Sequence, residues 1–261
     1  MGQTMNEKLF PTRYIPDFKI PLDHTETIDV RMRLATQKIK LSIYLPKNAT
    51  DISRTIIYIH GNGENIYLID GYMYVYANMH NSRVVSFDWC GYGDSTGSAS
   101  EFSMLRCTNT VFNFVKQKYQ ISNSDIIVWG NSIGSVSSIY MGSIYPDLKC
   151  CIAQSPPASS NDVWGKSCVN RLKSYQRIIN VECPIYIIHG TSDKIVPFRN
   201  AVKLVQNFDG IIDFELTDVF EGVKMFKTWN LRLFAVMGGE HNNLQSLFSE
   251  QLEFCVKQAM D

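Results

Sequence analysis

Several familiar signatures are missing from this chain of 261 residues. Its 25 basic and 25 acidic side chains cancel, so no overall field attracts a phosphate backbone, and we expect no nucleic-acid partner. The seven cysteines show no Cys-x-x-Cys spacing, which argues against a zinc site or a disulfide framework. Neither a G-x-x-x-x-G-K-[ST] phosphate loop nor an H-E-x-x-H motif occurs, and we expect no metal and no cofactor.

A long apolar run is also missing. The first thirty residues contain Pro11, Pro16 and Pro21 and nothing resembling a signal peptide or a membrane span. This predicts a cytoplasmic protein, with peripheral membrane contact left open, in which the Asn48-Ala49-Thr50 sequon is unused. Residues 1–27 are interpreted as an N-terminal arm and 28–261 as a single domain, because a chain this long can bury one large core. The oligomeric state stays open.

Apolar runs alternate with helix-length segments along the rest of the chain. Residues 38–46 alternate apolar and polar side chains, as a half-buried strand does. Nearly continuous apolar runs, typical of parallel strands covered on both faces, occupy 55–60, 84–89, 125–130, 150–155, 184–189 and 231–237. The helical segments are 66–80, 103–119, 133–145, 198–208 and 243–260. This order predicts a mostly parallel sheet with helices on both faces. Residues 156–181 and 209–230 do not fit it and are candidates to cover the C-terminal edge of the sheet as a minimal lid.

The sequence Gly130-Asn131-Ser132-Ile133-Gly134 matches G-x-S-x-G between a predicted buried strand and a predicted helix. A strand-to-helix turn this tight leaves no room for side chains at Gly130 and Gly134, and its strain holds the Ser132 hydroxyl above the sheet. The pentapeptide taken alone equally fits a serine that caps a helix.

A serine hydroxyl becomes a nucleophile only when a base accepts its proton and a third group orients that base. Asp193 follows the predicted strand 184–189, and His241 follows the last predicted strand. Alone, Asp193 fits a turn or capping residue and His241 a loop histidine. Separate explanations would require all three residues to follow predicted buried strands, in the order Ser, Asp, His, by coincidence, which is much less probable than a shared role. We therefore predict a catalytic triad of Ser132, His241 and Asp193.

Acyl transfer also needs hydrogen-bond donors where the oxyanion forms. His60-Gly61-Asn62-Gly63 follows the first buried run, and we assign the backbone N–H groups of Asn62 and Ile133 to this role. His60 lies where a rival base would, but a histidine at a strand end more often supports its loop. His189 and Asp88 are interpreted in the same way, as loop supports.

These pieces resemble serine hydrolases of the α/β-hydrolase superfamily and, within it, the α/β-hydrolase-domain protein 17 subfamily of protein depalmitoylases. The matching segments are His60-Gly61-Asn62, Phe87 through Gly97, Trp129 through Gly134, Ile187 through Thr191 with Asp193, and Gly239 through Asn242. The resemblance implies the α/β-hydrolase fold and cleavage of an acyl ester or an S-acylated protein, with Ser132 attacking the acyl carbonyl, His241 shuttling the proton and Asp193 orienting His241. The subfamily's N-terminal acylated cysteines have no counterpart here, where the first cysteine is Cys90.

Two other functions fit the same fold: a binding module without catalysis, and a serine peptidase. The acyl-binding surface is equally open. Aromatic side chains in the two interrupting stretches either line an acyl pocket or belong to the core: Trp164, Tyr175, Phe220 and Phe226.

Overall fold

The computed structural model describes residues 9–10, 22, 24–47, 52, 54–165, 170–210 and 213–260. Most of the predicted arm at 1–27 and the sequon at 48–50 lie outside the described residues. The chain divides into two compact units, Met1–Ile127 and Val128–Asp261. The single domain expected over 28–261 stays a prediction.

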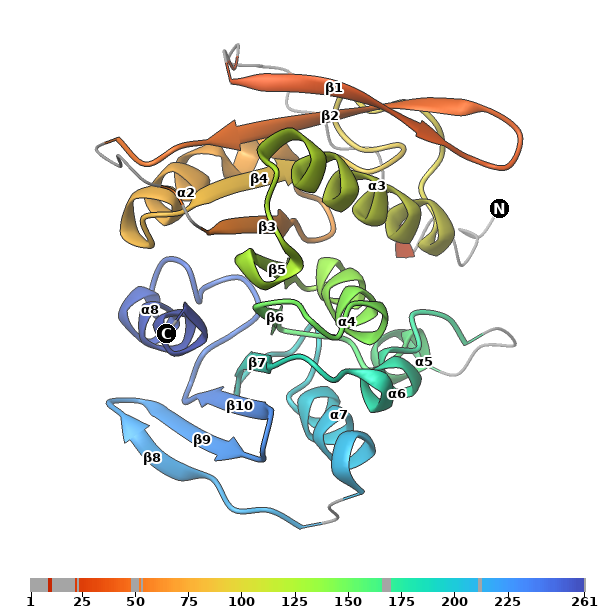
Figure 1. Cartoon of the computed structure of the whole chain (residues 1–261). Helices are drawn as coiled ribbons and strands as arrows, with labels where there is room; N and C mark the ends of the chain where they lie inside the picture. Colours follow the sequence, from red (N-terminus) through yellow and green to blue (C-terminus); the bar gives the residue numbers. More distant parts are fainter. Residues whose placement is uncertain are drawn as a thin grey trace. The chain divides into compact units, whose positions relative to one another are not determined.

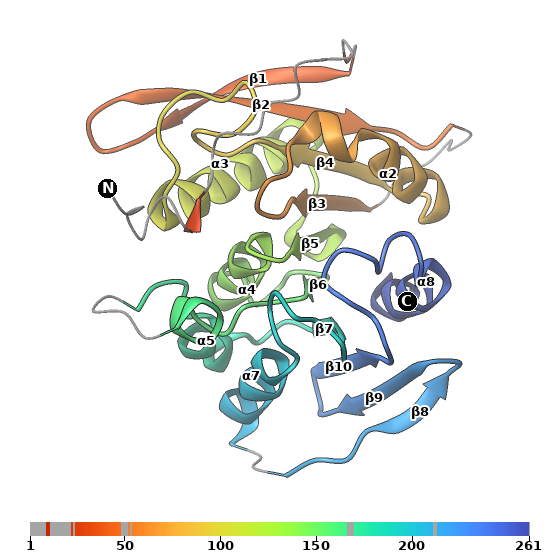
Figure 2. The ribbon, with the colours of Figure 1, turned by 180° about the vertical axis from the view of Figure 1, so that it is seen from behind.

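The first unit contains four strands that neighbour one another in the order β1-β2-β4-β3. Strands β3 and β4 are parallel, whereas β1–β2 and β2–β4 are antiparallel pairs. Helices α2 and α3 lie on opposite faces of these strands (Figures 1 and 2). The elements are β1 (Thr25–Arg31), β2 (Thr36–Tyr44), β3 (Thr55–Ile59), α2 (Ile66–Met79), β4 (Arg83–Phe87), α3 (Glu101–Tyr119) and the 3₁₀ turn η1 (Asn123–Asp125).

Local side chains determine where these helices begin and end. The Asn65 side chain caps α2 by accepting hydrogen bonds from the backbone N–H groups of its first turn. Ser100 caps α3 in a capping box with Ser103, and Lys116 and Lys118 occupy the last turn, where the helix dipole favours cations. The helix ends at Gln120, which adopts a left-handed conformation with φ 52°.

The second unit begins within strand β5 (Ile126–Asn131), which starts at the end of the first unit. Its other strands follow the order β6-β7-β10-β9-β8. Strands β6, β7 and β10 are mutually parallel, and β9 and β8 are antiparallel additions. Helices α4 and α7 cover one face of these strands and α8 the other (Figures 1 and 2). The remaining bounds are α4 (Gly134–Ile144), β6 (Cys150–Gln154), α5 (Ser160–Trp164), α6 (Ser174–Arg177), η2 (Ile178–Asn180), β7 (Ile185–Gly190), α7 (Arg199–Asp209), β8 (Thr217–Phe220), β9 (Val223–Lys227), β10 (Leu231–Val236) and α8 (Ser249–Met260).

The continuous apolar runs form buried strands, as expected from their composition. Every residue of β3, β6 and β7 is buried, because helices cover both faces of the strands. The largest fully buried side chains include Phe87 and Phe112 in the first unit and Trp129 and Phe234 in the second. The six cysteines among the described residues are free thiols. No helix in this described part is long and apolar enough to cross a membrane.

Three expectations about the chain's organisation need correction. Strand β1 begins at Thr25, inside the segment interpreted as an arm. Of the stretch 209–230, which was expected to cover the strand ends, residues 217–220 and 223–227 form β8 and β9, which extend the strands of the second unit sideways. Helix α8 begins at Ser249 rather than at residue 243. The backbone carbonyl of Asn243 accepts hydrogen bonds from the N–H groups of residues 246–248, which form a tight turn before the helix.

Candidate active site

Ser132 lies at a strained turn between β5 and α4. Its φ is +51°, in the left-handed region that non-glycine residues rarely adopt, and its backbone N–H donates to Gln154 O at 2.8 Å. A Cβ at Gly130 would lie 2.3 Å from Gly134 O, so only glycine fits there. Gly134 is the first residue of α4, and its carbonyl makes this close contact. The turn thus holds the Ser132 side chain at the start of the helix.

The strand register brings the other two side chains to the same edge. Gly190, the last residue of β7, pairs with Val236, the last residue of β10, in parallel register. The chain continues from these residues into the two loops that carry Asp193 and His241. A backbone bond of 2.9 Å from Ser192 N–H to Gly239 O ties the loops together. Residues about fifty positions apart in the sequence therefore become neighbours.

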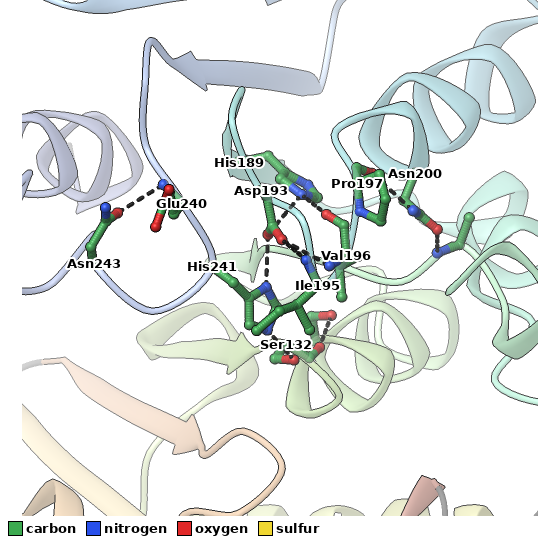
Figure 3. Close-up of polar contacts among 12 residues, drawn as sticks. Ser132, His189, Asp193, Ile195, Val196, Pro197, Asn200, Glu240, His241 and Asn243 are labelled. Carbon is green, nitrogen blue, oxygen red and sulfur yellow. Dashed lines mark hydrogen bonds and ion pairs between the residues drawn. The ribbon is translucent and has the colours of Figure 1, made fainter. Parts of the chain in front are cut away.

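The three predicted side chains form a continuous hydrogen-bonded chain (Figure 3). His241 Nδ1 lies 2.7 Å from Asp193 Oδ2, and His241 Nε2 lies 2.8 Å from Ser132 Oγ. An ionised carboxylate only accepts hydrogen bonds, so the proton of neutral His241 is assigned to Nδ1. Nε2 is then free to accept the proton of the Ser132 hydroxyl, as a general base requires.

Asp193 is buried, and its surroundings favour the ionised form. Burial alone would raise the pKa of its carboxyl, but hydrogen bonds from His189 and His241, the charge of His241 and the Val196 backbone N–H outweigh it. The net effect holds the pKa of Asp193 well below its ordinary value. Its Oδ1 accepts the backbone N–H groups of Ile195 at 2.9 Å and Val196 at 2.8 Å. The carboxylate is therefore charged and fixed in direction at neutral pH.

His189 supports this carboxylate from behind. Its Nε2 lies 2.7 Å from Val196 O and 3.3 Å from Asp193 Oδ2. Because a carbonyl oxygen can only accept, Nε2 carries the proton, which points toward both oxygens. The loop-support interpretation of His189 matches these contacts, but sequence reasoning missed its contact with Asp193. The spacing of four residues between the two was an available signal.

The two predicted oxyanion donors belong to different units. In the second unit, the Ile133 N–H donates to no acceptor among the described residues, and the same holds for Asn62 N–H in the first. The Asn62 side chain is held at both ends: Tyr92 Oη donates to its Oδ1 at 2.5 Å, and its Nδ2 donates to Leu9 O at 2.9 Å. The pairing of Asn62 with Ile133 as an oxyanion hole stays a prediction.

His60 and Asp88 support the loop that carries Asn62. His60 Nδ1 donates to Gly61 O at 2.8 Å, and its Nε2 lies 3.2 Å from Asp88 Oδ1. Asp88 Oδ1 also accepts the first N–H of α2, from Ile66, at 2.9 Å. Trp89 stacks on the His60 ring with centroids 4.0 Å apart. The His60 ring is fully buried. These contacts match a supporting role.

A shallow pocket of about 160 Å³ adjoins His241 within the second unit, lined also by Lys194, Ile195, Glu240, Asn242 and Asn243. Ligand pockets for drug-sized molecules hold roughly 300–1,000 Å³, so this one has room for a small polar group and not for an acyl chain.

The aromatic side chains considered for an acyl pocket do not line this one. Phe220 stacks on Phe254 with centroids 4.7 Å apart, and Phe226 packs on Phe214 at 4.5 Å. Tyr175 lies under the ammonium of Lys203 at 4.6 Å. These three side chains pack against neighbouring elements of the second unit.

Comparison with solved structures decides the fold. An esterase from Pyrococcus furiosus matches with a TM-score of 0.68 at 15% identity, over 90% of each chain. A monoacylglycerol lipase from Paleococcus ferrophilus matches at 0.61 and 14%, over 85% of this chain and 98% of that one. A family model described as the alpha/beta hydrolase fold matches residues 54–177.

This chain has the α/β-hydrolase fold. Its sequence is also similar to curated alpha/beta hydrolase domain-containing proteins. It is 25% identical to alpha/beta hydrolase domain-containing protein aho-3 from Caenorhabditis elegans, over 71% of this chain and 57% of the relative. It is 23% identical to alpha/beta hydrolase domain-containing protein 17C from Mus musculus, over 73% of this chain and 61% of the relative. Both matches leave more than a third of the relative's length uncovered. The predicted fold and resemblance are confirmed.

Proposed function

We propose that this protein is a serine hydrolase that cleaves acyl esters or thioesters through an acyl-enzyme intermediate. The observation that carries the proposal is the chain of contacts from Ser132 Oγ through His241 to the charged Asp193. The low pKa of Asp193 keeps its carboxylate charged beside His241, and the nucleophile occupies a strained turn.

The reaction follows from these contacts. His241 Nε2 accepts the hydroxyl proton as Ser132 Oγ forms a bond to the acyl carbon, and the carbonyl oxygen becomes an anion, for which the predicted donors are the N–H groups of Ile133 and Asn62. The bond from the acyl carbon to the leaving oxygen or sulfur breaks, and the imidazolium of His241 gives its proton to the leaving group. Water then adds to the acyl-serine, passes a proton to His241, and releases the acid as Ser132 regains its hydrogen.

The proposed natural substrate is an S-acylated protein, because the sequence is similar to the domain-17 proteins over most of its length. The small pocket beside His241 suits the leaving-group side, since His241 must reach the departing atom to protonate it. A series of thioesters and oxyesters with increasing acyl length tests this substrate. Faster cleavage of long-chain thioesters supports it, and equal rates on all substrates contradict depalmitoylation while leaving the hydrolase intact.

Fluorophosphonate labelling tests the nucleophile. The wild-type protein is expected to be labelled, and Ser132→Ala to lose the label and to fall by about 10⁴-fold or more in kcat on p-nitrophenyl esters. Ser143→Ala is the matched control, because Ser143 lies on α4 and its hydroxyl donates to Tyr140 O. Labelling that survives in Ser132→Ala would remove Ser132 from the role. No labelling and no turnover of any ester would favour a binding module, and cleavage of peptides alone would favour a peptidase.

A further inference from the structure

An exposed leucine marks the turn between β1 and β2. The backbone N–H of Met32 donates to Ala35 O at 2.9 Å, which closes a tight turn with Arg33 and Leu34 at its apex. Leu34 is 100% exposed, and the next most exposed large apolar side chain among the described residues, Leu247, reaches 76%. A single exposed leucine is common on protein surfaces and carries no conclusion alone.

Cationic and aromatic side chains contact the residues next to this leucine in the turn. The Arg33 guanidinium lies 5.3 Å from the centre of the Phe102 ring, and Phe102, near the start of α3, is 50% exposed. The Arg106 side chain donates from Nε to Arg31 O at 3.2 Å. Both contacts brace the turn against α3. We call these five residues, Arg31, Arg33, Leu34, Phe102 and Arg106, the basic tip; in Figure 1 its turn is the loop at the right-hand end of β1 and β2.

Among the described residues, the acidic groups nearest in the sequence do not cancel its charge. Asp29, two residues before Arg31, lies 3.3 Å from the ammonium of Lys38, so these two charges neutralise each other. Glu101, which precedes Phe102, is half-buried and offsets at most one of the three guanidinium groups. The basic tip is therefore a positive patch on a chain whose formal net charge is zero.

We propose that the basic tip docks this protein on an anionic lipid surface. Leu34 and Phe102 enter the headgroup region, and the three guanidinium groups bind lipid phosphates and carboxylates. An exposed apolar apex flanked by cations suits a surface that is anionic outside and apolar beneath. A nucleic acid would match the cations and leave Leu34 in water. The turn is already braced, so little conformational entropy is lost on docking.

This inference does not depend on the proposed catalysis, because all its residues belong to the first unit and none to the triad.

Co-sedimentation of the full chain with vesicles tests the proposal. The wild-type protein should bind vesicles of phosphatidylcholine with one third phosphatidylserine, should bind pure phosphatidylcholine weakly, and should be released by high salt. Arg33→Glu changes the local charge by two and should weaken partitioning by about 30-fold. Leu34→Ser removes the apex side chain and should weaken it by about tenfold.

Matched variants in the second unit control for charge and exposed apolar area. Lys227→Glu at the exposed end of β9 and Leu247→Ser should bind as the wild type does. Ser132→Ala should also bind normally, so a failure of the catalytic proposal stays separate from a failure of this one. Circular dichroism and urea unfolding of the Arg33 and Leu34 variants verify folding. Absence of wild-type binding to the anionic vesicles, or equal binding by all variants, overturns the proposal. Tip-dependent binding to nucleic acid in place of vesicles overturns it as well.

Discussion

Replacing Asp193 with asparagine tests the hydrogen-bonded triad most directly. The amide oxygen of the new side chain can still accept the backbone N–H groups of Ile195 and Val196 at 2.9 and 2.8 Å. Its NH₂ group then takes the place of Oδ2, which lies 2.7 Å from His241 Nδ1. Two donors face each other there, so His241 must move its proton to Nε2. In that tautomer Nε2 cannot accept the proton of Ser132.

The expected loss in kcat is about 10⁴-fold, which corresponds to roughly 5 kcal/mol of added barrier. Hydrolysis of p-nitrophenyl butyrate, measured against pH for the wild type and Asp193→Asn, gives this number. Asp162→Asn is the matched control, because Asp162 is paired with Lys203 at 2.8 Å and belongs to the same unit. If Asp193→Asn kept its kcat within tenfold of the wild type, with an unchanged pH profile, the assigned tautomer and role of His241 would be wrong.

The same variant should change acid stability. The pKa of Asp193 is held below its unfolded value, so the carboxylate contributes stability that is fully present above the unfolded pKa of about 3.9. That stability is lost as the pH falls through the folded pKa. The amide in Asp193→Asn cannot titrate, so the unfolding free energy of the variant should fall less steeply with acid below about pH 4. Urea unfolding at several pH values measures the two slopes, and parallel slopes would contradict the argument.

Two further predictions concern a tightly packed glycine and a buried histidine. A Cβ at Gly190 would lie 2.2 Å from Gly239 O and push apart the loops of Asp193 and His241. Gly190→Ala should therefore lower kcat/KM for ester hydrolysis by about 100-fold. Gly71→Ala is the control and should leave ester hydrolysis unchanged, because the space around its Cβ is open. Burial lowers the pKa of His80 to about 4, whereas the unfolded chain binds this proton near pH 6.5. The unfolding free energy of the wild type should therefore fall by up to about 3 kcal/mol as the pH drops from 6.5 to 4. His80→Phe should lack that loss in urea titrations, and an unchanged acid dependence would show that His80 does not cause it.

The strands and helices that the sequence predicted are those with strong local patterns. Buried runs such as β3 and β7 are almost entirely apolar because both faces are covered. Strand β1 was missed because its residues are mostly half-buried or exposed and carry charges. Strands β8 and β9 were missed for the same reason: β9 has one buried residue and β8 none. Their place in the fold depends on the pairing of β9 with β10 rather than on their own composition.

The sequence by itself determined the turn around Ser132, the order of the buried strands and the three candidate residues at their ends, because short-range sterics and burial leave marks in neighbouring residues. Only the tertiary structure decided that β7 and β10 pair side by side, which brings Asp193 to His241, and that Asp193 also meets His189. It alone showed that Leu34 is fully exposed and that the neighbouring Arg33 lies over the Phe102 ring. Such contacts depend on strand register and on packing between distant segments, and no local pattern encodes them.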